Sequence, residues 1–213
     1  MINFMLPLQI YFHHKFMTDT DIEKLAAENQ ARAKAVLDES GISRIWADAG
    51  CRVNLVGSLK MGLLMTHRDI DLHVYSGGIT EQKSFTIASR MATDPRVTEI
   101  KCINGLHTDE HCVAWHVTFK ADDGTPWQFD IIHIEDGSRY DGYFERMADR
   151  IVETMTDRQR EIILRLKYEA GDNCDFHGVE FYEAVIADGI DTLDDLRQWV
   201  DRHRKKQPYY WIP

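Results

Sequence analysis

The stretch from Gly57 to Tyr75, GSLKMGLLMTHRDIDLHVY, places a Gly-Ser pair eleven residues ahead of the tripeptide Asp-Ile-Asp. Its last seven residues alternate between polar and apolar, which is typical of a β-strand with one buried face. Asp69 and Asp71 therefore extend from the same face of the strand. Two carboxylates this close repel each other unless water or a cation separates them. The pair thus predicts either a cation site or a strand face open to water.

The composition narrows the class of function. The chain has 213 residues and a formal net charge of −10, which argues against an extended nucleic-acid partner because such partners need a basic surface. A nucleotide stays compatible with this charge, because a metal ion brings its own positive charge. The sequence has no apolar run of the roughly 20 residues that a membrane span needs. Its four cysteines are irregularly spaced, as in reduced cytoplasmic proteins, and we expect a cytoplasmic protein without a membrane partner. The sequence leaves the oligomeric state open.

Periodicity divides the chain into two predicted regions. Residues 1–136 show mixed α/β patterns, and residues 137–213 form a C-terminal helical region with apolar residues at i, i+3 and i+4. We expect helices near residues 18–40, 80–93, 140–155, 157–171, 178–189 and 192–206, and strands near residues 52–56, 69–75, 96–103, 111–121 and 126–134. The apolar residues 1–16 allow two interpretations, an N-terminal strand or arm, or an extension upstream of a start at Met17.

A third acid completes the predicted metal site. Asp130 lies in the segment WQFDIIHI (127–134), where its neighbours are apolar, so its place in a central strand needs a reason. Mg²⁺ prefers carboxylate and phosphate oxygens, and a third carboxylate from a neighbouring strand would complete a two-metal site. Gly57 lets the backbone approach a phosphate, and Ser58 can offer its hydroxyl and N–H groups to an anion.

Together these residues resemble the nucleotidyltransferases of the DNA polymerase β superfamily, over residues 52–134. The resemblance rests on VGS, the eleven-residue step, DIDL, and the later Asp130 in an apolar strand. It implies an α+β fold, with a small mixed β-sheet flanked by helices. It also implies two Mg²⁺ ions held by Asp69, Asp71 and Asp130, with Asp130 helping to activate an acceptor hydroxyl. The form HRDIDL and the helical region are similar to members that adenylylate antibiotics.

From this resemblance we expect a transferase that moves a nucleoside monophosphate from a nucleoside triphosphate, such as ATP, to a hydroxyl of a small molecule or protein. Gly57 and Ser58 would hold the β- and γ-phosphates, and Lys60 and Arg68, which flank the motif, are further candidates. In the helical region we interpret the basic residues mostly as a solvated face from which one or two reach the triphosphate. They are Arg146, Arg150, Arg158, Arg165 and Lys167.

Other interpretations stay open from the sequence. The acids could belong to a solvated edge strand, Asp130 could pair with an arginine, and Gly57-Ser58 could be a plain turn. We interpret HTDEHC (107–112) as a polar loop, because its spacing matches no standard zinc pattern. A catalytically silent regulatory or interaction module, such as an antitoxin, is the alternative function. A third possibility keeps the metals but catalyses nucleotide cyclisation or phosphohydrolysis.

Overall fold

The computed structural model describes residues 17–204 and 211–213, so the predicted N-terminal strand or arm at 1–16 lies outside the described residues. The described chain begins with helices α1 (Asp19–Ser40) and α2 (Ile42–Ala47). Then follow β1 (Arg52–Leu55), α3 (Gly57–Lys60), β2 (Asp69–Ser76), α4 (Glu81–Met91), β3 (Val97–Asn104), β4 (Cys112–Lys120) and β5 (Pro126–Glu135). The remaining described helices are α5 (Tyr143–Thr154), α6 (Asp157–Ala170), α7 (Gly178–Ile186) and α8 (Leu193–His203).

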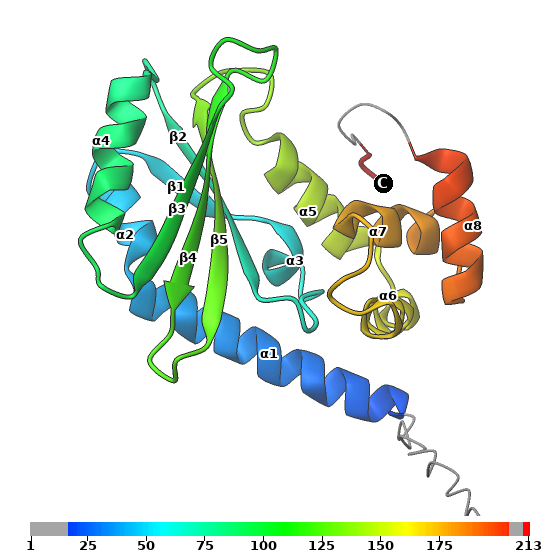
Figure 1. Ribbon diagram of the computed structural model, residues 1–213. Coiled ribbons are helices and arrows are strands. Elements are labelled where there is room, and N and C mark those ends of the chain that lie inside the picture. Colours follow the sequence, from blue (N-terminus) through cyan, green and yellow to red (C-terminus); the bar gives the residue numbers. More distant parts are fainter. Residues whose placement is uncertain (1–16, 205–210) are drawn as a thin grey trace, which may run out of the picture.

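Within the described residues the strands form one sheet in the order β1-β2-β5-β4-β3. β2 and β5 are parallel, and the other neighbours are antiparallel. Helices α2 and α4 cover one face of the sheet, and α5 to α8 lie on its other side (Figure 1). The predicted α+β fold, a small mixed sheet flanked by helices, is therefore confirmed.

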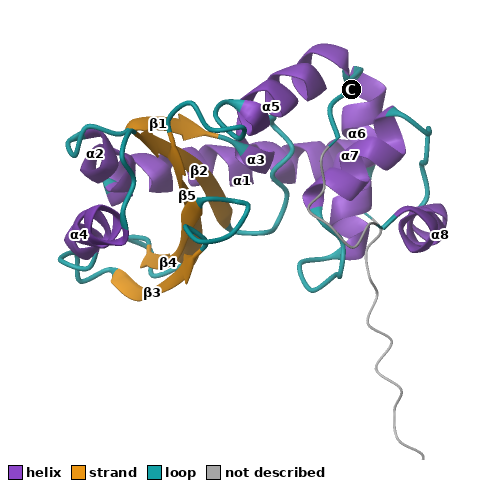
Figure 2. Cartoon of the chain, turned by 90° about the horizontal axis from the view of Figure 1, so that it is seen from above, coloured by secondary structure: helices purple, strands orange, loops and turns teal. Residues whose placement is uncertain are grey.

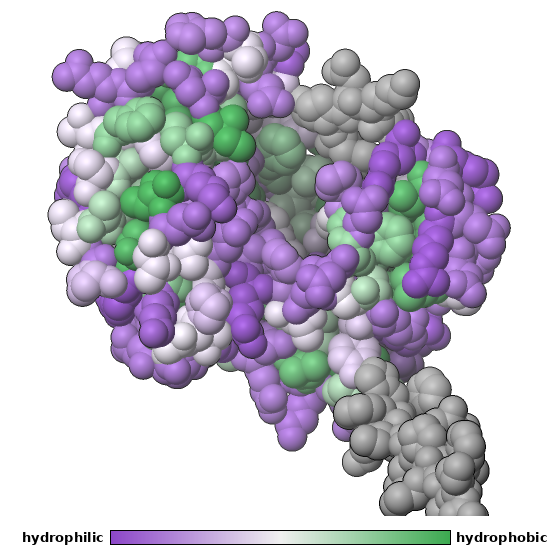
Figure 3. Space-filling model, in the orientation of Figure 1, coloured by the Kyte–Doolittle hydropathy of each residue, from purple (hydrophilic) through white to green (hydrophobic). Residues whose placement is uncertain are grey.

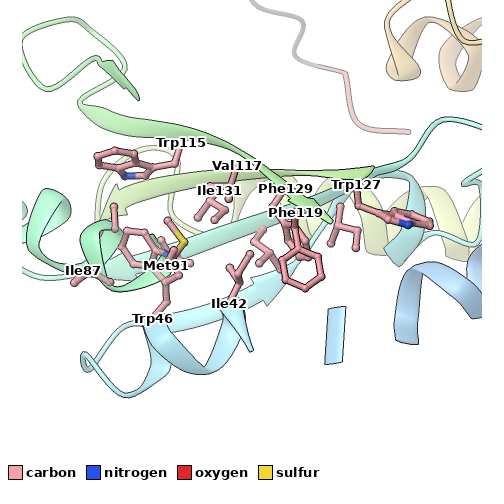
Figure 4. Packing of buried hydrophobic residues seen from close by; sticks show 14 of the residues in the cluster. Ile42, Trp46, Ile87, Met91, Trp115, Val117, Phe119, Trp127, Phe129 and Ile131 are labelled. Atoms are coloured by element: carbon pink, nitrogen blue, oxygen red, sulfur yellow. The ribbon is translucent and has the colours of Figure 1, made fainter. Parts of the chain in front are cut away.

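The alternation along β2 places its apolar residues in the main core. Ile70, Leu72 and Val74 are buried among residues of the two helices that cover this face. Figure 4 shows Trp46 and Ile42 from α2 and Met91 from α4 pointing toward the sheet residues of this cluster. The polar residues of β2 must then point to the opposite face, because successive side chains of a strand alternate.

A second core joins the C-terminal helices to one another. It contains Ile151, Leu166, Phe181 and Trp199, and the segment after α3 contributes Met61 and Leu63 to it. Helix α1 runs along both regions (Figure 2) and packs on α6. The predicted boundary between the two regions, after residue 136, stays a prediction. Met61 and Leu63 belong to the first region in sequence but contribute to the core of the second.

Within the described ranges, no helix combines the length and the apolar character that crossing a membrane would demand. Helices such as α4 and α8 are instead amphipathic, with one buried and one exposed side, as expected for helices packed on a core.

Candidate functional site: three carboxylates in a cleft

Three aspartates meet at the sheet face that looks toward the C-terminal helices. Asp71 of β2 stands directly opposite Asp130 of β5 in the parallel pairing, and Asp69 lies two residues before Asp71. One carboxylate oxygen from each of the three lies within 4.8 Å of the other two. Such a cluster of oxygen ligands suits a hard divalent cation. The interpretation of Asp130 as the partner of an arginine finds no support, because its hydrogen-bond partners are His116 and Gln128.

Gly57 packs directly against the side chain of Asp71. Its φ of +67° lies in the left-handed region, and a Cβ there would come 2.9 Å from Cβ of Asp71 and closer still to its carboxylate. The neighbouring Val56 N–H donates to the backbone carbonyl of Asp71 at 3.0 Å. A residue without a side chain is therefore required here for two reasons, the backbone angle and the close approach of Asp71.

Ser58 lies at the second position of the short helix α3 and lines the same cleft as the aspartates. The structure thus brings Gly57 and Ser58 to the acids, as the sequence motif predicts. The chain bends sharply after α3, with Leu63 N–H donating to the Ser58 carbonyl at 2.8 Å. What Ser58 binds stays a prediction.

Burial and mutual repulsion act on the ionisation of the acids. Burial, with the charges of Asp69 and Asp130, raises the pKa of Asp71 to about 8. Burial also acts to raise the pKa of Asp69, but the hydrogen bond from His67 and the charge of Lys167 outweigh it and lower that pKa. Three ionised carboxylates are thus unfavourable here without a cation, since like charges disfavour ionisation of their neighbours.

Lys167 of α6 is the basic residue that the fold brings to the acids. Its Nζ donates to the Leu63 carbonyl at 2.8 Å and lies 5.7 Å from the ring centroid of Tyr182. Burial lowers the pKa of Lys167, while Asp69 and Asp71 act in the opposite direction. The side chain lines the cleft, and its charge interacts with the two acids of β2.

The cleft between the two regions has a volume of about 650 Å³, and Figure 3 shows a hollow at this place. At one end it is polar, with the three aspartates, Ser58 and Lys167. The rest of the wall is largely apolar and comes from the sheet, from α5 and from the region of α7. These residues include Ala114, Ile132, Ile134, Phe144, Met147, Phe176, Val179 and Phe181. A planar base or ring and a charged phosphate chain would each find a matching surface in such a cleft.

The structure places the other predicted binding residues elsewhere. Lys60 lies 3.5 Å from Asp149 in an exposed ion pair, and Arg68 is exposed. Neither belongs to the described residues that line the cleft. The same holds for the four arginines of the helical region, Arg146, Arg150, Arg158 and Arg165, which bond to carboxylates or carbonyls near them.

Residues 107–111 of the HTDEHC segment form a polar loop, and Cys112 begins β4. His107 bonds to Glu81 at 2.9 Å, and His111 bonds to the Leu106 carbonyl at 2.8 Å. Among the described residues, the three aspartates are the group whose geometry could hold a metal ion. The buried Trp46, Trp115, Trp127 and Trp199 serve the cores.

Sequence reasoning missed three side chains of the site. His67 lies 2.9 Å from Asp69, and His116 and Gln128 bond to Asp130. The sequence did contain a signal for His116. The hairpin turn at 121–125 fixes the register of the two strands beside it, and this register pairs residue 116 with residue 130. Sequence reasoning named Lys167 but could not separate it from the surface arginines of the same region.

Comparisons by sequence return nothing: no protein-family model and no curated protein matches the chain. Solved structures do match. Cid1 poly(U) polymerase bound to MgATP has a TM-score of 0.52 and 15% identity, with 71% of this chain and 47% of that chain covered. The non-canonical poly(A) polymerase GLD-2 in complex with GLD-3 has a TM-score of 0.56 and 12% identity, with 89% of this chain and 66% of that chain covered. The complex of GLD-2 with RNP-8 has a TM-score of 0.56 and 13% identity, with 89% of this chain and 67% of that chain covered.

The chain therefore shares its fold with these solved polymerases, and the nucleotidyltransferase-like α+β fold that the resemblance implies is confirmed. The chain spans about half of the Cid1 chain and about two-thirds of the GLD-2 chains.

Proposed function

We propose that this chain is a metal-dependent nucleotidyltransferase, which transfers a nucleoside monophosphate from a nucleoside triphosphate to a hydroxyl of a small molecule or protein. The observation that carries the proposal is the meeting of Asp69, Asp71 and Asp130 beside Gly57 and Ser58 at the polar end of the cleft. A silent interaction module gives no physical reason for three converging carboxylates, because they repel one another in the absence of a cation.

The donor set fits Mg²⁺. All three groups are carboxylates, they converge within one site, and burial with the charges of Asp69 and Asp130 raises the pKa of Asp71, so that a divalent cation would favour its ionised form. Asp69, Asp71 and Asp130 would hold the ions, two in number if the resemblance extends to the metals. Bound ions would neutralise the charge that develops on the attacking and leaving oxygens.

The chain's own groups would orient the substrates. Ser58 and Lys167 would bind the β- and γ-phosphates, the first by its hydroxyl and N–H groups and the second by its charge. In the reaction the acceptor oxygen forms a bond to the α-phosphorus, the bond from that phosphorus to the β-phosphate oxygen breaks, and pyrophosphate leaves. Asp130 would take the proton of the acceptor hydroxyl.

The choice of acceptor rests on the charge of the cleft. Among the described residues that line it, Lys167 is the single lysine or arginine, whereas Glu110 and Asp172 add two acids to the three aspartates. An extended nucleic acid would need more cations to neutralise its phosphates. The similarity to poly(U) and poly(A) polymerases nevertheless makes the 3′ end of an RNA the second acceptor to test.

The decisive experiment incubates the protein with each nucleoside triphosphate, Mg²⁺ and a panel of acceptors, and measures pyrophosphate release. The panel contains hydroxyl compounds, proteins including the chain itself, and short RNA. We expect release with a small-molecule or protein acceptor and none with Asp71→Asn. Mass spectrometry of the products separates transfer from cyclisation or phosphohydrolysis. A chain that releases neither pyrophosphate nor phosphate from any triphosphate would be the interaction module instead.

A further inference from the structure

A histidine of β4 and a glutamine of β5 engage the third carboxylate of the site. His116 stands directly opposite Asp130 in the antiparallel pairing of the two strands. Its Nδ1 lies 2.5 Å from Oδ1 of Asp130, and Nε2 of Gln128 donates to the same oxygen at 2.8 Å. An ionised carboxylate only accepts hydrogen bonds, so Nδ1 of His116 must carry the proton.

The strand order separates the two oxygens of Asp130. Because β5 lies between β2 and β4, His116 approaches Asp130 from the side away from Asp71. The two hydrogen bonds described above both end on Oδ1, and no other described residue donates to Oδ2. One oxygen is thus held by the protein and the other stays available to a ligand.

His67 has a similar contact with Asp69, but in a more exposed setting. Its Nδ1 lies 2.9 Å from Oδ1 of Asp69, and its side chain is 56% exposed, whereas that of His116 is 33% exposed. Exposed hydrogen bonds compete with water and contribute less to orientation. His116 is therefore the histidine whose removal should affect the site more.

We propose that His116 is a positioning residue for metal binding: with the Gln128 amide it holds Oδ1 of Asp130 and leaves Oδ2 for a divalent ion. This inference rests on the proposed function, since it needs Asp130 to be a metal ligand. Groups that hydrogen-bond to metal ligands orient them before the ion arrives, and their loss lowers metal affinity by about 10- to 100-fold.

The test measures the affinity for Mn²⁺ alone, by electron paramagnetic resonance of the free ion. His116→Ala removes the donor, and we expect its Kd for Mn²⁺ to rise by about 10- to 100-fold. His116→Asn keeps an N–H group near the position of Nδ1 and should bind Mn²⁺ nearly as tightly as the wild type. His116→Gln places its amide near the position of Nε2 instead, and it should bind as weakly as His116→Ala.

The matched control is His107→Ala, a substitution of an exposed histidine that bonds to Glu81 away from the cleft. It should leave the Kd for Mn²⁺ unchanged. Wild-type affinity in folded His116→Ala, or equal affinities of the Asn and Gln variants, would overturn the positioning role. A wild type that binds no Mn²⁺ would overturn the proposed function itself, so the two failures are distinguishable.

Discussion

At the residue scale, the side chain of Asp71 occupies the space in which a side chain at position 57 would lie. An alanine at position 57 would require both a left-handed backbone and displacement of the Asp71 carboxylate. We expect Gly57→Ala to lower the free energy of unfolding by about 1 to 3 kcal/mol, the usual range for such backbone strain. Mn²⁺ affinity should fall as well, because Asp71 must move.

Gly77→Ala is the matched control for this prediction, since Gly77 is exposed, has no positive φ and has open space where a Cβ would lie. Chemical denaturation and Mn²⁺ titration measure both effects. Equal behaviour of the two variants would show that the approach of Gly57 to Asp71 has no role in the site.

His133 is a second residue whose surroundings make a measurable prediction. It is fully buried, its ring nitrogens bond to Ser76 at 2.8 Å and Ser84 at 3.0 Å, and Trp46 packs edge-on against it. Burial and, to a lesser extent, the charge of Lys83 lower the pKa of His133 to about 4, although the charge of Glu135 acts in the opposite direction. The folded chain therefore keeps this ring neutral.

The unfolded chain takes up a proton at His133 below pH 6.5, whereas the folded chain does not until about pH 4. The stability that the neutral ring contributes is thus complete above pH 6.5 and is lost as the pH falls toward 4. Between pH 7 and 5 the expected loss is about 2 kcal/mol. Urea denaturation of the wild type and His133→Gln measures it, and parallel pH profiles of the two proteins would contradict the prediction.

At the scale of elements, α6 connects the helical region to the acids through Lys167. Its Nζ donates to the Leu63 carbonyl, and its charge interacts with those of Asp69 and Asp71. Lys167→Met should weaken triphosphate binding by roughly tenfold or more, as expected for loss of a hydrogen bond to a charged group. Isothermal titration with a non-hydrolysable triphosphate and Mg²⁺ measures the effect.

Lys60→Met is the control, because Lys60 pairs with Asp149 at the surface. If Lys60→Met lost affinity and Lys167→Met kept it, the triphosphate would bind beside Lys60 and not beside Lys167, which would contradict the prediction.

The periodicity of the sequence predicts single helices and strands better than it predicts how they pack on one another. The alternation of residues 69–75 is sufficient to predict β2 and the common direction of its acids. Helix α2 was not predicted, because Ser40-Gly41 marks the end of a helix; Gly41, at φ +63°, in fact ends α1 and starts α2 at once. The selection of Lys167 and the placement of Lys60 depend on how α6 and α3 pack, and that packing is a long-range property that residue spacing does not contain.

At the scale of the whole molecule, the two regions form the cleft together. The sheet supplies the acids, while α6, α7 and the segment between them supply Lys167 and much of the apolar wall. A molecule of net charge −10 with five acids and one lysine along its cleft should bind a triphosphate only together with divalent cations, because only the cations reverse the repulsion.

The central claim is that Asp69, Asp71 and Asp130 bind divalent metal together with a triphosphate. Thermal unfolding of the wild type, Asp71→Asn and the surface control Asp149→Asn, with and without Mg²⁺ and each triphosphate, tests it. Ligands at a hundred times their Kd should stabilise the wild type and the control by about 2.7 kcal/mol, and Asp71→Asn much less. Without metal, Asp71→Asn should be as stable as the wild type or more so, because a repulsion is removed. The account would be contradicted if Mg²⁺ and every triphosphate left the melting temperature of the wild type unchanged and Asp71→Asn failed to fold.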